Sequence, residues 1–134
     1  MILSSAAMCL ALNMFYEARN EGIVAQMLVA EVTINRVEDP RFPDSICGVV
    51  WQNKQFSWTH DGKSDNPEKL NYPDRVVWAQ VKELAQELTE NPGVLPNTGA
   101  THYHATYVDP YWNTDPKMEQ VAKHQSHIFY RWKK

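Results

Sequence analysis

The stretch that decides the fold is residues 9–36, which read CLALNMFYEARNEG followed by IVAQMLVAEVTINR. Apolar residues recur in both halves at the spacing of one face of an α-helix. They are Leu10, Met14 and Ala18 in the first half, and Ile23, Met27, Ala30, Ile34 and Val37 in the second. Between the halves, Gly22 suits the left-handed backbone that ends a helix. The stretch therefore predicts two helices joined at residues 20–22, with Glu17 near the end of the first.

Capping and stopping residues define the neighbouring elements. Ser4 or Ser5 can cap the first helix, and Pro43 lies beyond the end of the second. Asp44 can cap a short helix over residues 45–51. These signals place a third, short helix directly after the opening pair.

The second half of the chain combines one long helix with shorter elements. Pro73 fits the first turn of a helix that ends at residues 91–93. We expect strands over residues 100–108 and 127–132, and a short helix over residues 115–124. The predicted fold class is α+β and mainly helical, with residues 1–134 forming one domain.

Composition limits the classes of function. The 134 residues are 43% hydrophobic and 22% charged, as in a soluble globular domain, and the net charge of −3 gives no attraction for nucleic acid. No apolar run approaches the roughly 18–20 residues of a membrane span. The apolar N-terminus lacks a basic segment, so we interpret it as helix and not as a secretory signal. Cys9 and Cys47 permit one disulfide, although two buried thiols are an equally good interpretation.

Glu17 is the strongest candidate for acid–base chemistry. It follows Phe15 and Tyr16 in a segment otherwise built for burial. Apolar neighbours raise the pKa of a carboxyl group, whereas a nearby cation such as Arg19 lowers it. Most helical glutamates are simply exposed, but a carboxylic acid that donates a proton near neutral pH needs such a half-apolar setting. We therefore predict that Glu17 is a general acid.

A run of aromatic and polar residues predicts a sugar-binding groove. Gln55, Phe56, Ser57 and Trp58 alternate rings with hydrogen-bonding groups, and Tyr103 lies in a predicted strand. Sugars stack their C–H faces on aromatic rings, and polar side chains bond their hydroxyls. Packing in the core is the alternative for any single ring. As a set, these residues favour a groove wall.

The histidines support a rival hypothesis. His102 and His104 are two residues apart and share one face of a strand, and His124 and His127 follow later. Such a set could bind zinc, which takes three or four ligands, so a metal hydrolase is the rival hypothesis. The pattern lacks a His-Glu-x-x-His pair, which weakens this reading.

Several segments read together resemble the SleB/CwlJ-type cell wall hydrolase family. This family includes spore cortex-lytic enzymes and occurs in bacteriophages as stand-alone endolysins. The matching segments are residues 16–21 (YEARNE), 32–37 (VTINRV), 42–50 (FPDSICGVV), 55–58 (QFSW), 100–104 (ATHYH), 110–112 (PYW) and 127–130 (HIFY). Asn20 departs from the usual glycine of the family, but asparagine tolerates the same left-handed backbone.

The resemblance implies a lysozyme-like, two-lobed catalytic domain that cleaves peptidoglycan glycan strands. It implies that Glu17 is the catalytic acid and that the bond between N-acetylmuramic acid and N-acetylglucosamine is cleaved, often as a lytic transglycosylase. That reaction needs one carboxyl group, whereas a hydrolase usually needs a second one at about 5–9 Å. Glu21, Glu31 and Asp61 are available for that role, but their settings do not mark any of them out.

With a cell-wall substrate implied, the alternatives are a zinc-dependent amidase or peptidase that uses the His cluster and a wall-binding module without catalysis. The remaining site assignments follow from the leading interpretation. The expected substrate-binding residues are Gln55, Phe56, Ser57, Trp58, Tyr103, His104 and His127. The expected supporting residues are Tyr16, Arg19, Glu21 and Asn35. We expect no cofactor or metal, a monomer, and glycan strands as the partner. The protein would act at the cell wall, either as an endolysin held in the cytoplasm until holin-mediated release or as a trimmed bacterial enzyme.

Overall fold

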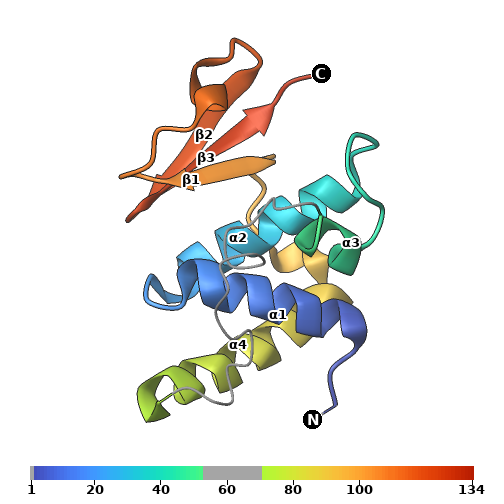
Figure 1. Ribbon diagram of the computed structural model, residues 1–134. Helices are drawn as coiled ribbons and strands as arrows, with labels where there is room; N and C mark the ends of the chain where they lie inside the picture. The colour runs from blue at the N-terminus through green and yellow to red at the C-terminus, as the bar shows by residue number, and fades with distance from the viewer. Residues whose placement is uncertain (1, 53–70) are drawn as a thin grey trace.

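The computed structural model describes residues 2–52 and 71–134, and these form a helical lobe and a strand lobe (Figure 1). The helices are α1 (Ser5–Ala18), α2 (Gly22–Val37), α3 (Ile46–Val50) and α4 (Tyr72–Glu90), with short 3-10 helices at Pro92–Val94 and Tyr111–Thr114. The strands are β1 (His102–Ala105), β2 (Met118–His124) and β3 (His127–Trp132). The predicted α+β, mainly helical, two-lobed class is confirmed.

The helical lobe is built around α1, which packs against α2, α3 and α4. Ser4 caps α1 by accepting a hydrogen bond from the backbone N–H of Ala7 at 3.1 Å. The buried cluster on α1 and α4 consists of Leu10, Ala11, Met14 and Phe15 from α1 with Trp78, Val81, Ala85 and Leu88 from α4. The apolar stripe predicted for the first helix therefore faces the core of this lobe.

The turn between α1 and α2 has the predicted backbone. Gly22 adopts a φ of +87°, which is the left-handed region that glycine reaches without strain. The second helix begins at Gly22, one residue before the expected start. The turn places Glu17 and Glu21 at the same end of the helical lobe.

A disulfide bond links the first and third helices. Cys9 of α1 and Cys47 of α3 are joined by a disulfide bond. The cap of α3 is Ser45, whose hydroxyl accepts from the N–H of Gly48 at 3.0 Å, and not the expected Asp44. The short helix after Pro43 is thus fastened to α1 by a covalent bond.

The strand lobe is an antiparallel sheet with the strand order β1-β3-β2. In its register Tyr103 of β1 faces Phe129 of the central strand β3. Phe129 and Ala100 pack against Val29 and Val32 of α2 in a second buried cluster. The sheet therefore rests on α2, while α4 lies on the far side of the helical lobe (Figure 1).

The helix predicted over residues 115–124 is wrong, because the chain forms the strand β2 there. Asp115 and Pro116 open a turn instead of a helix, with Asp115 accepting from the N–H of Lys117 at 2.8 Å. A two-residue turn at Gln125 and Ser126, with a φ of +49° at Gln125, then pairs β2 with β3. Edge pairing with the apolar strand β3 outweighs the weak local helix signal.

The other boundaries differ by a few residues. The strand expected over 100–108 is limited to His102–Ala105, and α4 begins at Tyr72 with Asn71 as its cap. None of the helices in residues 2–52 and 71–134 is long and apolar enough to cross a membrane.

Candidate active site

Glu17 lies in the last turn of α1, where the helical lobe meets β1. Its side chain is half-buried and accepts a hydrogen bond from the hydroxyl of Tyr103. Burial raises the pKa of Glu17 to about 7, and the Tyr103 hydrogen bond opposes part of this rise. Near neutral pH both the acid and the carboxylate are therefore populated. A group of this kind can give a proton and take one back in the same reaction.

Tyr103 connects Glu17 to a buried polar residue that the sequence analysis did not single out. Asn13 lies one helical turn before Glu17 on α1, is fully buried, and hydrogen-bonds to the Tyr103 side chain. Burial and the neighbouring Glu17 raise the pKa of Tyr103 well above its usual value. The phenol therefore stays protonated and remains a donor to Glu17. The signal for Asn13 was a polar residue within an apolar helix, four positions before the candidate acid.

Arg36 is a second residue that the sequence analysis left without a role. It is buried at the end of α2, and its Nε donates to the carbonyl oxygen of Thr101 at 2.7 Å. Burial lowers the pKa of Arg36 to about 10, so it remains charged at neutral pH. This charge acts on Tyr103 and opposes the rise of its pKa. Arg36 thus ties the start of β1 to α2 and contributes a positive charge that acts on Tyr103.

Glu21 joins the two lobes next to the candidate acid. Its carboxylate accepts hydrogen bonds from the backbone N–H of Ser126 at 3.1 Å, from the Ser126 hydroxyl, and from Nδ1 of His127 at 3.0 Å. These donors lower the pKa of Glu21, with the Ser126 hydroxyl contributing most. The carboxylate therefore stays ionised and holds the β2–β3 turn against the α1–α2 turn. The His127 ring lies 5.7 Å from that of Tyr103, which brings this contact beside the Glu17 site.

The predicted supporting residues Arg19, Tyr16 and Asn35 have structural contacts. Arg19 lies 3.8 Å from Asp74 and stacks over the Phe15 ring, so the expected lowering of the Glu17 pKa by Arg19 is not found. Tyr16 packs edge-on against Phe15, at 5.2 Å between ring centres. Asn35 donates to the carbonyl oxygen of Ala100 at 2.8 Å and thereby positions the start of β1.

Glu31 binds the backbone just before β1. Its carboxylate accepts from the backbone N–H of Thr98 at 3.0 Å, from the Thr98 hydroxyl at 2.7 Å and from the N–H of Gly99 at 2.9 Å. It also accepts from Asn35 at 2.9 Å. Both oxygens of Glu31 therefore have structural partners. Three carboxylates were considered as a second catalytic group. Glu21 and Glu31 already accept hydrogen bonds within the protein, and Asp61 lies outside the described residues.

His102 and His104 of the strand lobe are held by hydrogen bonds within the protein. His104 is buried, its Nδ1 donates to the carbonyl oxygen of Ala105 at 2.7 Å, and its Nε2 accepts from the Tyr130 hydroxyl at 2.9 Å. Nδ1 of His102 pairs with the Thr101 hydroxyl at 3.0 Å. Within residues 2–52 and 71–134, no three or more His, Cys, Asp or Glu side chains are grouped so that they could hold a metal ion. The ligand set of the zinc hypothesis is therefore not assembled in this part of the chain.

The remaining predicted groove residues are not placed by the structure. Gln55, Phe56, Ser57 and Trp58 lie outside the described residues. Of the predicted substrate-binding set, the structure brings Tyr103 and His127 close to Glu17 and Glu21. It places His104 beneath the Trp112 and Tyr130 rings, on the strand lobe.

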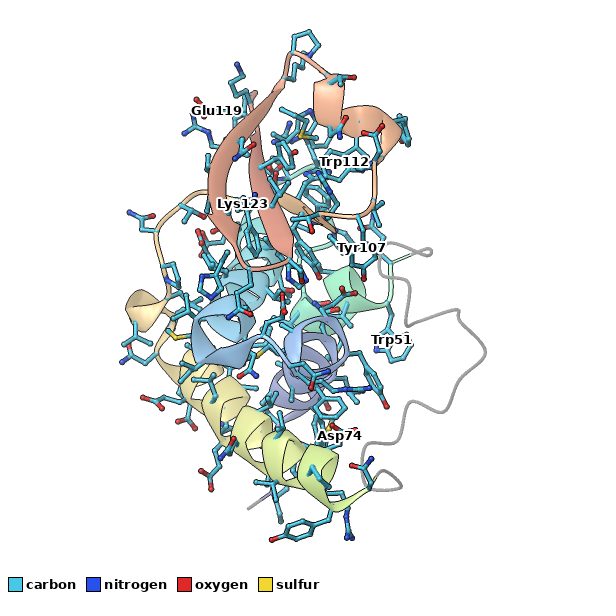
Figure 2. The ribbon with its side chains drawn as sticks, turned by 90° about the vertical axis from the view of Figure 1, so that its left-hand side faces the viewer. Trp51, Asp74, Tyr107, Trp112, Glu119 and Lys123 are labelled. Carbon is cyan, nitrogen blue, oxygen red and sulfur yellow. A yellow bond between two sulfur atoms is a disulfide. The ribbon has the colours of Figure 1, made fainter. Side chains whose placement is uncertain are left out.

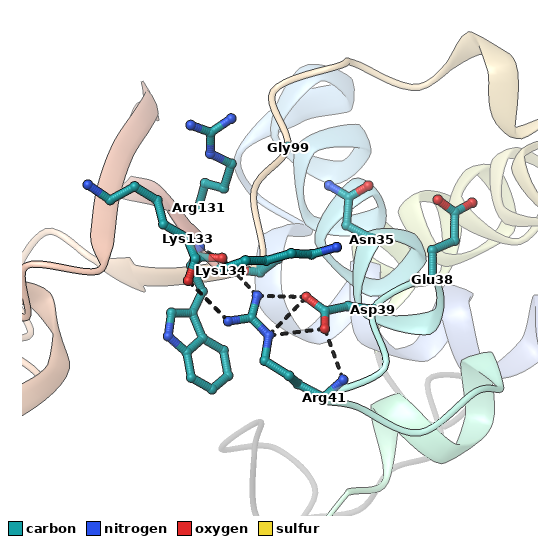
Figure 3. A pocket seen from close by; sticks show the side chains of 10 residues that line it. Asn35, Glu38, Asp39, Arg41, Gly99, Arg131, Lys133 and Lys134 are labelled. Atoms are coloured by element: carbon teal, nitrogen blue, oxygen red, sulfur yellow. Dashed lines mark hydrogen bonds and ion pairs between the residues drawn. The ribbon is translucent and has the colours of Figure 1, made fainter.

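A separate cavity of about 470 Å³ opens at the other end of α2 (Figure 3). It is lined by Asn35, Asp39, Arg41 and the segment 131–134, but not by Glu17 or Tyr103. Arg41 pairs with Asp39 at 2.8 Å and donates to the carbonyl oxygen of Trp132 at 2.8 Å. These contacts fasten the end of β3 to the loop after α2, and we assign the cavity no part in the Glu17 site.

Comparison with known proteins identifies relatives that share the sequence pattern. A family model described as Cell Wall Hydrolase matches residues 20–130, a range that begins just after Glu17. The spore cortex-lytic enzyme of Halalkalibacterium halodurans is 29% identical over 117 residues, which are 86% of this chain and 32% of that protein. That of Bacillus subtilis is 29% identical over 119 residues, which are 86% of this chain and 35% of that protein. The chain thus spans about a third of the length of these curated relatives.

The fold is shared with a solved structure. The catalytic domain of the germination-specific lytic transglycosylase SleB from Bacillus anthracis superimposes with a TM-score of 0.66 and 24% sequence identity. The match covers 96% of both chains. The expected lysozyme-like, single-domain fold is therefore confirmed across nearly the whole chain.

Proposed function

Since the chain belongs to the Cell Wall Hydrolase family, we propose that it cleaves peptidoglycan glycan strands with Glu17 as the general acid and base. The bond cleaved is that between N-acetylmuramic acid and N-acetylglucosamine. The observation that carries the proposal is the half-buried Glu17 carboxyl, whose pKa is raised to about 7 and whose oxygen accepts a hydrogen bond from Tyr103. This is the ionisation that a proton donor to a glycosidic oxygen requires.

The reaction proceeds in two proton transfers. Protonated Glu17 gives its proton to the glycosidic oxygen, the bond to C1 of muramic acid breaks, and positive charge develops on that sugar. The Glu17 carboxylate then removes the proton from the C6 hydroxyl of the same sugar. The C6 oxygen attacks C1 and closes a 1,6-anhydro ring, so Glu17 ends protonated as it began. Tyr103 stabilises the intermediate carboxylate by its hydrogen bond.

Among the described residues, the two carboxylates considered as a second catalytic group are already engaged, which favours a transglycosylase over a hydrolase. A hydrolase needs a second carboxylate about 5–9 Å from the acid to act as base or nucleophile. Glu21 is held by Ser126 and His127, and Glu31 by Thr98, Gly99 and Asn35. Freeing either one would break the contacts that hold β1 or the β2–β3 turn in place. The muramic acid C6 hydroxyl supplies the nucleophile without a second carboxylate.

The setting of the activity is part of the same proposal. Residues 1–134 act as one catalytic domain, a monomer that binds glycan strands in the murein layer or periplasm and needs no cofactor. A substrate in the wall and the negative net charge of −3 both speak against nucleic acid as a partner.

The test is the Glu17→Gln variant on purified sacculi. Gln keeps the size of the side chain and can still accept from Tyr103, so the fold is retained while turbidity clearing is lost. Glu83→Gln, an exposed change on α4, is the matched control and retains activity. Lysis by Glu17→Gln at the wild-type rate would refute the assignment.

Mass spectrometry of the soluble products distinguishes the reaction types. Anhydro-muramic ends support the transglycosylase, and reducing muramic ends would instead show a muramidase. Free stem peptides would show an amidase or peptidase and would overturn the proposal. Sacculus binding without any soluble product would show a wall-binding module.

A further inference from the structure

An exposed aromatic surface follows β1 and has no role in the site described above. Residues 106–111, here called the tyrosine loop, contain Tyr107 and Tyr111, whose exposed fractions are 85% and 94%. Val108 between them is also exposed. Single exposed apolar residues are ordinary, but two largely exposed aromatic rings within five positions are typical of a surface that binds a partner.

Hydrogen bonds and ring packing anchor the tyrosine loop to the strand lobe. The N–H of Thr106 donates to the carbonyl oxygen of Ser126 at 2.8 Å, and the N–H of Val108 donates to that of Ala105 at 3.0 Å. After the loop, the Trp112 ring packs at 5.3 Å from the Tyr130 ring and at 5.6 Å from that of His104. Backbone hydrogen bonds and the packing of Trp112 thus anchor both ends of the segment that carries the two tyrosines, so little backbone entropy is lost when a ligand stacks on them.

The tyrosine loop begins beside the candidate active site. Tyr103, the partner of Glu17, lies three residues before Thr106 on β1. Ser126, which accepts from Thr106, also donates to Glu21 at the junction of the lobes. In Figure 2, Tyr107 lies on the same side of the molecule as Trp51, which is 45% exposed on the helical lobe, and Trp112. Exposed aromatic rings thus occur on this side of both lobes.

The chemistry of the surface fits uncharged sugar rings. Residues 106–114 (TYVDPYWNT) contain no lysine or arginine, so nothing there attracts the carboxylates of stem peptides or an anionic lipid surface. Tyrosine offers a flat apolar face for sugar C–H groups together with a hydroxyl for sugar oxygens. Asn113 donates to Asp109 at 2.8 Å, and these two polar side chains of the same segment add donors and acceptors.

We propose that Tyr107 and Tyr111 form a binding subsite for the glycan strand, away from the bond that is cleaved. The inference rests on the proposed function and extends it. The subsite binds further sugars of the same strand and makes long glycan strands better substrates than short fragments. It contributes to binding and not to the proton transfers at Glu17.

The binding test uses the Tyr107→Ala and Tyr111→Ala double change in the Glu17→Gln protein, so that the wall is not consumed. Co-sedimentation is measured with purified sacculi and with glycan strands stripped of their stem peptides. We expect binding to both to weaken about tenfold, since two stacking contacts are lost. The control is Tyr72→Ala, a ring 71% exposed at the start of α4, which leaves binding unchanged. The Tyr107→Phe and Tyr111→Phe double change keeps both rings and retains most of the binding.

Kinetics with intact Glu17 complete the test. The double alanine variant raises KM for long strands and leaves kcat, and the rate on disaccharide-sized fragments, unchanged. If the double alanine variant keeps the wild-type binding and KM, the subsite proposal is wrong. It is also wrong if the wild type self-associates and the double alanine change abolishes this self-association. If the wild type cleaves strands while the variants bind normally, the subsite fails and the proposed function stands. If the variants lose binding while the wild type releases no glycan product, the proposed function fails and the surface stands.

Discussion

The pKa of Glu17 predicts a stability difference that changes with pH. Folding raises the pKa of this carboxyl from 4.5 to about 7, because burial disfavours the charged form. The folded state therefore binds the proton more tightly than the unfolded chain does. The resulting stability is fully present below about pH 4.5 and is lost as the pH rises through about 7. At pH 8 the ionised Glu17 lowers the free energy of unfolding, whereas a neutral side chain at this position would not.

The magnitude follows from the size of the shift. At 1.36 kcal/mol per pKa unit, a rise from 4.5 to about 7 corresponds to about 3 kcal/mol. Because the side chain is only half-buried, solvent screening reduces this figure to about 2 kcal/mol. Glu17→Gln removes the charge and keeps the acceptor for Tyr103. We expect the variant to be about 2 kcal/mol more stable than the wild type at pH 8, with the difference falling to less than half of this at pH 5.

Urea unfolding at pH 5, 6, 7 and 8 measures this difference directly. Glu83→Gln, on the exposed face of α4, serves as the control and shows no comparable gain in stability between pH 5 and pH 8. A difference between Glu17→Gln and the wild type that is constant from pH 5 to pH 8 would refute the reasoning, because the stability change would then have no link to ionisation. A loss of stability at pH 8 would refute it as well.

Three further predictions concern the surroundings of this residue. Tyr103→Phe removes a hydrogen bond that lowers the pKa of Glu17, so the alkaline limb of the kcat/KM profile shifts upward by about one pH unit and kcat falls. Glu21→Gln weakens the contacts with Ser126 and His127, and unfolding in urea shows a loss of about 1 kcal/mol at pH 7 that disappears as the pH falls below the depressed pKa of Glu21. Replacing Cys9 and Cys47 by Ser removes a link across a sequence separation of 38, which lowers the free energy of unfolding by about 4 kcal/mol, measured in urea without reductant.

The helices were predictable because their signals are local. Apolar spacing, Ser4, Gly22 and Pro73 each act within one or two turns, and the structure follows them closely. The strand β2 was missed because its stability comes from pairing with β3, and residues 115–124 carry no strong pattern of their own. A short edge strand with many polar residues is decided by its neighbour.

The candidate acid was predictable, but the residues that set its pKa were less so. Glu17 is conspicuous beside Phe15 and Tyr16, and the family resemblance reinforces it. Its partner Tyr103 is 86 positions away in the chain and was expected to line a groove. Asn13 and Arg36 take their roles from burial next to Tyr103, which only the packing of β1 on the helices creates.

The strand order has a consequence for the newly made protein. The central strand, β3, follows β1 and β2 in the sequence, and β1 is hydrogen-bonded to it along its length. A nascent chain that has emerged only to residue 125 can form α1 and carry Glu17, yet it has nothing to hold Tyr103 in place. Its acid would then lack the hydrogen bond that stabilises the carboxylate. The pairing of Tyr103 with Glu17 therefore waits until residues 127–132 have been made and have paired with β1.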